Sequence, residues 1–198
     1  MNDLYDPGYG GWFAGNPDLD PERSRSSELG LQWQATELQQ LGLSLYSTRV
    51  RDLISFTGHQ NQAENIAHAA IDGAELSWRL DAGAWNLDAN WTWQDARDED
   101  SDTRLLRRPR QKGSAVVERA FGERLRVGAE LFHNGRRDDV GGLELDAYTL
   151  LNLRADWTLA DAWTIGARLE NLTDRNYELV HGYNTPGRSG FVELIWHP

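Results

Sequence analysis

The sequence contains no cysteine, and this absence removes several kinds of chemistry at once. Without cysteine there is no disulfide, no thiolate metal site and no thiol nucleophile. No apolar run approaches the ~18 residues that a transmembrane helix requires. Basic residues are also few, because 20 Lys and Arg stand against 31 Asp and Glu, for a net charge of −11. Such an acidic chain is a poor general binder of nucleic acid, so we expect no nucleic-acid partner.

The sequence also lacks an arrangement of side chains that would support catalysis. No motif combines Ser, His and Asp, and no glycine-rich phosphate loop leads from a strand into a helix. Asp98, Asp100 and Asp102 alternate like calcium ligands, but Pro109 at the twelfth position excludes an EF-hand and favours a solvated acidic loop. The histidines share no metal-site spacing: His59, His68, His133, His181 and His197. We therefore predict a protein that is not an enzyme and that has no catalytic residue, no cofactor and no metal.

Tryptophan and glycine, in contrast, are abundant, with nine and 19 residues in a chain of 198. Apolar and polar side chains alternate along most of the length. Successive side chains of a strand point to opposite faces, so each alternating segment has one apolar and one polar face. The pattern predicts nine antiparallel strands, near residues 26–35, 38–48, 62–80, 84–96, 111–120, 124–134, 145–158, 162–170 and 188–197.

The predicted strands are joined alternately by short turns and longer polar segments. The short turns lie at 36–37, 81–83, 121–123 and 159–161, and the long segments lie at 97–110, 135–144 and 171–187, with a shorter connection near 58–61. This alternation is typical of an up-and-down antiparallel sheet with functional loops at one end. Residues 1–25 do not alternate, and we expect them to form another loop.

The tryptophans gather at fixed levels of the predicted apolar face. Most lie within a few residues of a short turn, whereas Trp93 lies at the opposite end of its strand from Trp85. Along a strand tilted by roughly 40°, the separation of Trp85 and Trp93 projects to about 20 Å. This is close to the height of the apolar band of an outer-membrane barrel. We predict an aromatic girdle at a membrane interface, formed by Trp33, Trp78, Trp85, Trp93, Trp157, Trp163 and Trp196. The alternative is a soluble sandwich or barrel in which the tryptophans pack an interior core.

Three segments resemble TonB-dependent outer-membrane receptors. Residues 171–178 (Asn-Leu-Thr-Asp-Arg-Asn-Tyr-Glu) and 182–188 (Gly-Tyr-Asn-Thr-Pro-Gly-Arg), before a final alternating strand, look like the C-terminal end of that family. Residues 16–22 resemble its loop-to-strand motif, and residues 105–111 resemble the segment that re-enters the barrel after a long loop. The C-terminal segment, with Tyr177-Glu178, Gly182-Tyr183 and Gly187-Arg188, most resembles the vitamin B12 (cobalamin) receptors, and siderophore receptors share most of it.

The resemblance implies an all-β fold: an antiparallel up-and-down transmembrane β-barrel that is partial here, with about nine of roughly 22 strands. Residues 1–25 would form an extracellular loop and 26–198 the strands and loops, with the plug domain absent. The first residues offer no signal peptide, and Trp196-His197-Pro198 displaces the family's terminal aromatic. We interpret the sequence as a C-terminal fragment.

The function that the resemblance implies is active transport across the Gram-negative outer membrane of cobalamin or a similar bulky ligand. The partners would be outer-membrane lipid, lipopolysaccharide, a cobalamin or siderophore ligand, and the TonB complex through the missing N-terminal part. A siderophore receptor, a small soluble β-barrel ligand-binding protein and an independent small outer-membrane barrel are the alternatives. The odd strand number argues against the last of these.

Two groups of loop residues are candidates for binding. Tyr183, Asn184 and Arg188 are the possible ligand-facing residues, and a purely structural turn shaped by the nearby glycines is the alternative. A basic cluster could pair with lipopolysaccharide phosphates or anchor a strand end by packing its side-chain stems. It consists of Arg104, Arg107, Arg108, Arg110 and Lys112.

Overall fold

The computed structural model describes residues 15–55 and 62–197, and nearly all of its regular structure is β-strand. Nine long strands form one sheet in the order β1-β2-β3-β4-β5-β6-β9-β10-β11. Their bounds are β1 Arg23–Thr36, β2 Gln39–Ser55, β3 Glu64–Ala82, β4 Trp85–Asp98, β5 Gln111–Phe121, β6 Leu125–Asn134, β9 Tyr148–Ala160, β10 Trp163–Glu170 and β11 Ser189–Trp196. Within the described ranges, no helix has the length and apolar character to cross a membrane.

All nine predicted strands are confirmed, in the up-and-down order that the alternation of short turns and long connections indicates. β1 begins three residues earlier than predicted, at Arg23, and β2 continues to Ser55, beyond the predicted end at 48. The connection predicted near 58–61 lies outside the described residues. Where the chain reverses direction tightly, Gly83 and Gly122 adopt φ values of +63° and +64°. Glycine reaches this left-handed region without the strain that a Cβ would add.

The polar composition of the segment 135–144 predicts a loop, but the structure contains regular elements there. This segment carries β7 (Arg137–Asp139), the 3-10 turn η2 (Val140–Gly142) and β8 (Leu143–Leu145), and β7 pairs with β8 as a small two-stranded sheet. β9 consequently begins at Tyr148, three residues later than predicted. Arg137 and Asp139 share one face of β7 and are both buried, which explains why charged residues appear in a strand here.

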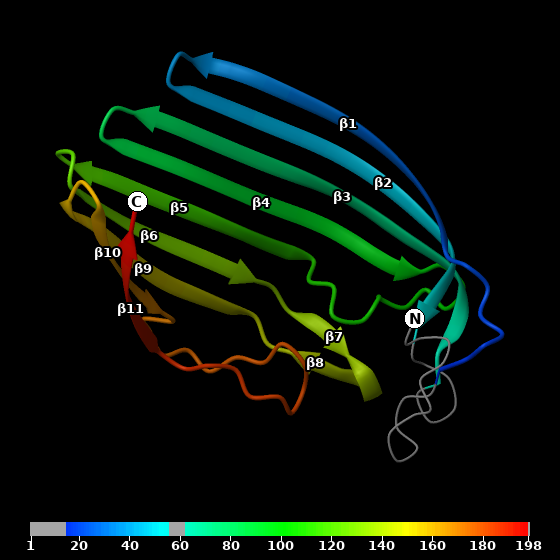
Figure 1. Ribbon diagram of the computed structural model, residues 1–198. Helices are drawn as coiled ribbons and strands as arrows, with labels where there is room; N and C mark the ends of the chain where they lie inside the picture. Colours follow the sequence, from blue (N-terminus) through cyan, green and yellow to red (C-terminus); the bar gives the residue numbers. More distant parts are fainter. Residues whose placement is uncertain (1–14, 56–61, 198) are drawn as a thin grey trace. The chain divides into compact units, whose positions relative to one another are not determined.

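The chain divides into two compact units, and several strands contribute to both. The first unit comprises residues 1–28, 46–73 and 95–105, and the second comprises 29–45, 74–94 and 106–198. In the first unit, Arg49 forms ion pairs with Asp72 at 2.9 Å and with Glu99 at 3.6 Å. In the second unit, β5, β6, β9, β10 and β11 lie side by side in that order (Figure 1).

The strand registers of the second unit separate an apolar face from a polar face. One row across four neighbouring strands is apolar, and it consists of Leu125, Trp157, Ile165 and Leu194. The adjacent row, one residue later on β6 and β10 and one residue earlier on β9 and β11, consists of Arg126, Asp156, Gly166 and Glu193. Because the side-chain period of a strand is two residues, this register keeps the two kinds of side chain on opposite faces.

Among the residues that the structure describes, the side chains of the apolar face are largely exposed. Trp33 is 60% exposed and Val192 is 80% exposed, and no large side chain among the described residues is fully buried. Few apolar residues are buried among all the described residues: Ala63, Ala69, Ala96, Leu145 and Tyr148. A soluble barrel would pack its apolar side chains inward, so this arrangement does not favour the soluble alternative.

Candidate functional site

The polar face of the second unit carries a network of cross-strand hydrogen bonds. Arg79 pairs with Asp88 at 2.8 Å, and Asn90 Nδ2 donates to Ser114 Oγ at 2.8 Å. Asn152 of β9 donates to Glu130 of β6 at 2.9 Å. These groups satisfy one another across neighbouring strands and make a hydrated surface, not an apolar core.

Tyr148, the first residue of β9, extends this polar face toward the loops. It lies on the same side of β9 as Asn152, because residues separated by an even number of steps share a face. Its ring centroid lies 4.5 Å from that of Tyr177 and 6.1 Å from that of Phe132. Tyr148 is only 5% exposed, so the aromatic pair closes one side of the space between the sheet and the loop 171–188.

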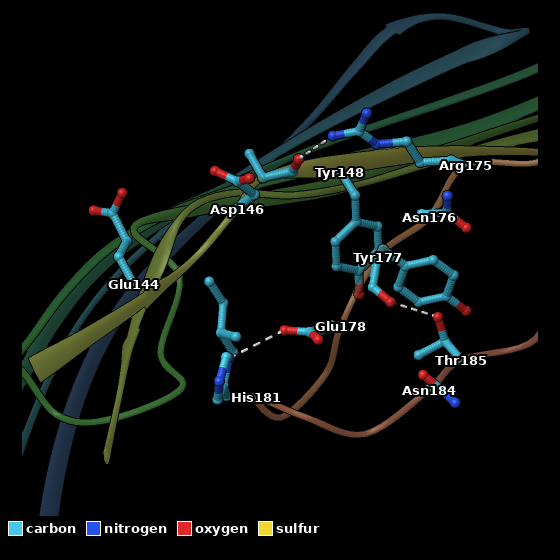
Figure 2. Close-up of a pocket in the computed structure, with 12 residues that line it drawn as sticks. Glu144, Asp146, Tyr148, Arg175, Asn176, Tyr177, Glu178, His181, Asn184 and Thr185 are labelled. Atoms are coloured by element: carbon cyan, nitrogen blue, oxygen red, sulfur yellow. Dashed lines mark hydrogen bonds and ion pairs between the residues drawn. The ribbon is translucent and has the colours of Figure 1, made fainter. Parts of the chain in front are cut away.

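A cavity of about 730 Å³ opens beside this aromatic pair. It is bounded by the β8–β9 connection and by the loop 171–188, which we call the last loop (Figure 2). Its lining residues are Glu144, Leu145, Asp146, Ala147, Tyr148, Arg175, Asn176, Tyr177, Glu178, His181, Asn184 and Thr185. The cavity is therefore the candidate site that this unit offers to a ligand.

Asp139 connects three segments of the chain, one of which contributes residues to the cavity. Its carboxylate is 2% exposed and accepts hydrogen bonds at 2.8 Å from Arg107 Nε, from the Val140 amide and from the His181 amide. Burial opposes the charged form, but the two amides and the Arg107 guanidinium outweigh it and hold the pKa of Asp139 below its usual value. The carboxylate thereby fixes the last loop to β7 and to the segment that precedes β5.

Arg137, two residues earlier on the same face of β7, makes a second connection to the last loop. Its guanidinium donates to the carbonyl oxygen of Glu178, and at 3.4 Å to those of Gly135 and Asp146. It also lies 5.4 Å from the centre of the Tyr148 ring. Because five donors in a rigid fork can bind several carbonyls at once, a buried arginine suits this bridging position.

The last loop is also held by its own side chains. Asn171 is buried, accepts from the Arg175 amide at 2.8 Å and donates to the Arg175 carbonyl at 2.9 Å. Thr185 donates to the Tyr177 carbonyl at 2.5 Å, and the Arg188 amide donates to Asp174 at 2.9 Å. Such bonds take the place of secondary structure and give the loop a defined conformation.

The three predicted ligand-facing residues occupy different positions. Asn184 lines the cavity. Tyr183 is 69% exposed and is not among the lining residues, and the backbone of Arg188 serves the internal bond to Asp174. The sequence reasoning did not identify Tyr148, Arg137 or Asp139, whose roles depend on contacts between distant segments.

The structure also places the girdle tryptophans, the basic cluster and the acidic residues near Asp98. The seven girdle tryptophans are all exposed on strands of the second unit, and Trp163 lies opposite Trp196 with ring centroids 6.4 Å apart. In the basic cluster, Arg107 is bound to Asp139. Asp98 accepts from the amides of Asp100 and Ser101 at 2.9 and 3.3 Å, as in a turn. Among the described residues, no group of three or more acidic or histidine side chains is arranged to hold a metal.

A strand-rich sheet with an exposed apolar face, a polar opposite face and structured loops at one end is the architecture of a membrane-barrel wall. Residues 1–172 match the model of the TonB dependent receptor-like β-barrel family. The chain belongs to this family.

Two curated relatives are similar to nearly the whole of this chain. The chain is 34% identical to the vitamin B12 transporter BtuB of Vibrio vulnificus, over 98% of this chain and 32% of that protein. It is 28% identical to the vitamin B12 transporter BtuB of Photobacterium profundum, over 99% of this chain and 33% of that protein. The chain thus spans about a third of the length of these relatives.

Solved structures share the fold at lower identity. The siderophore receptor PirA from Acinetobacter baumannii aligns with a TM-score of 0.76 and 22% identity, over 93% of this chain and 33% of that one. The ferripyoverdine receptor of the outer membrane of Pseudomonas aeruginosa aligns with a TM-score of 0.73 and 16% identity, over 90% and 27%. These likenesses establish the fold of the barrel wall. They do not identify the ligand, because one fold serves receptors of different ligands.

Proposed function

We propose that this chain forms part of the barrel of an outer-membrane receptor that takes up cobalamin. The observation that carries the proposal is the 34% identity to a vitamin B12 transporter across 98% of the chain. The likeness to siderophore receptors is weaker, at 22% identity or less in the structures compared above, and supports the fold alone.

Each face and loop of the chain has a part in this proposal. The exposed tryptophans and leucines would contact lipid, with the tryptophans as an interfacial girdle. Lipopolysaccharide phosphates would meet the members of the basic cluster, and the polar face would line the ligand's path. The last loop, with Asn184 at the cavity, would contact the ligand from outside the membrane. We assign no residue of this chain to the TonB complex, and we place its contacts in parts of the receptor outside the third that this chain spans.

A chimeric receptor tests the proposal directly. Residues 1–198 replace the corresponding third of the Vibrio vulnificus vitamin B12 transporter in a host that lacks its own, and binding and uptake of radiolabelled cyanocobalamin are measured. We expect specific, saturable binding and TonB-dependent uptake. A matched chimera that carries the corresponding segment of PirA from Acinetobacter baumannii is expected to bind little cyanocobalamin.

Assembly is checked separately from ligand binding. An assembled barrel resists denaturation by detergent until it is heated, so unheated and heated samples migrate differently on a gel. If the chimera assembles in the outer membrane but binds no cyanocobalamin, the proposed ligand is wrong. If the chimera binds a ferric siderophore instead, the chain would be assigned to a siderophore receptor.

A further inference from the structure

The cavity beside Tyr148 is large enough to hold part of a bulky ligand. Its volume of about 730 Å³ is that of a site for a drug-sized molecule, so a larger ligand would insert one edge only. The cavity lies at the loop end of β9, on the face that also carries Asn152 and Glu130. A ligand that approaches the polar face from the loops therefore meets it.

Acidic residues predominate among the charged residues that line the cavity. Glu144, Asp146 and Glu178 are lining residues, beside one basic lining residue, Arg175. The Glu144 carboxylate lies 3.5 Å from the Arg136 guanidinium, so Asp146 and Glu178 carry the acidic character of the lining. Arg175 donates to the Ala147 carbonyl at 3.5 Å, and His181 lies with its Nδ1 3.5 Å from Glu178 Oε2 (Figure 2). The Arg137 guanidinium is buried and bound to backbone carbonyls, so its donors are directed at the chain itself.

The uncharged part of the lining suits a flat, amide-bearing group. Tyr177, whose ring is tilted by 34° against that of Tyr148, presents aromatic surface, while Asn176, Asn184 and Thr185 supply neutral hydrogen-bonding groups. A ligand N–H that donates to a carboxylate forms a charge-assisted hydrogen bond. A ligand carboxylate at the same position would meet a like charge and lose its water without a compensating donor.

We propose that this cavity is a subsite for an uncharged, carboxamide-bearing edge of the transported ligand and that its carboxylates exclude ligands carrying an anionic group there. The inference rests on the function proposed above. It extends that function by locating a selective element in residues 144–148 and in the last loop.

Cyanocobalamin and its monocarboxylate derivatives provide the test. Each derivative has one peripheral carboxamide of the corrin ring hydrolysed to a carboxylate, so it differs from the parent by one charge and little in shape. Equilibrium binding of each is measured on the chimeric receptor and on the same receptor with Asp146→Asn and Glu178→Gln. A control receptor carries Glu123→Gln and Asp161→Asn, two exposed residues in short turns, and changes the net charge equally.

We expect at least one monocarboxylate to bind about tenfold more weakly than cyanocobalamin, which corresponds to about 1.4 kcal/mol. The cavity substitutions should recover most of that tenfold loss, and the control substitutions should leave it unchanged. If cyanocobalamin binds but no derivative's relative affinity shifts more in the cavity variant than in the control, the subsite is wrong. If an assembled receptor binds neither ligand, the proposed function itself fails.

Discussion

At the scale of single residues, Asp139 determines how the last loop is held. A buried carboxylate is stable only when donors replace its water, and here three donors come from three different segments. One of them, the His181 amide, belongs to a residue that lines the cavity. The shape of the cavity therefore depends on a side chain that is not itself part of the lining.

Substitution Asp139→Asn is expected to loosen the last loop without unfolding the sheet. Asparagine keeps the volume but loses the charge and one acceptor oxygen, so the Arg107 pair and one amide bond weaken, at a local cost of about 1 to 3 kcal/mol. Hydrogen–deuterium exchange of the chimeric receptor should accelerate around residues 178–185 and stay unchanged in β9 and β10. Asp138→Asn, at the neighbouring position on the opposite face of β7, is the control.

The same carboxylate gives this local stability a pH dependence of known sign. Because the folded-state pKa of Asp139 is lowered, its contribution is complete above the ordinary Asp pKa of about 3.9 and is lost as pH falls through the lower folded value. Exchange in the last loop, corrected for the intrinsic rate, should rise in that acidic range in the parent. Asp139→Asn should lack this rise, and an identical pH profile in both proteins would contradict the assignment.

At the scale of elements, the packing of β4 against β5 depends on Gly113. A Cβ at this position would lie 2.4 Å from a ring carbon of Trp91 and 2.6 Å from the Asn90 carbonyl oxygen. The Trp91 ring instead covers the glycine and stacks on His133 of β6, with centroids 5.3 Å apart. One small residue thus lets an aromatic side chain reach across two strand spacings.

We expect Gly113→Ala to destabilise this part of the sheet by about 1 to 3 kcal/mol, as overpacking does. The measurement is the temperature at which the chimeric receptor loses its heat-modifiable gel mobility. Gly30→Ala is the control, because a Cβ there meets nothing within 4 Å. Equal effects of the two substitutions would show that the contact with Trp91 does not limit stability.

The elements also show how far the sequence alone can predict this structure. Strands such as β4 and β9 alternate over ten or more residues, and a sustained period of two leaves little ambiguity. β7 and β8 have three residues each, too few to establish a period. The contacts of Asp139 reach 32 and 42 residues along the chain, so no local pattern could indicate them.

At the scale of the whole molecule, the two faces of the sheet require two different surroundings. The apolar face exposes tryptophans and leucines over many strands, while the opposite face is joined by polar cross-strand bonds. A monomeric soluble protein rarely leaves so extended an apolar surface in water. In lipid, the same surface would be fully solvated and the backbone would be satisfied by strand pairing.

The isolated 198-residue chain is therefore expected to be insoluble or aggregated in water and to require detergent. Within the described sheet, β1 and β11 each have one neighbouring strand, so each leaves an edge of unpaired amides and carbonyls that favours association with further strands. Sedimentation and size-exclusion chromatography, each with and without detergent, measure this. We expect pelleted material or large oligomers without detergent, and strand-rich circular dichroism in detergent. A stable monomer in detergent-free buffer would contradict the assignment of the apolar face to lipid, because such a monomer would have to cover that face with its own side chains.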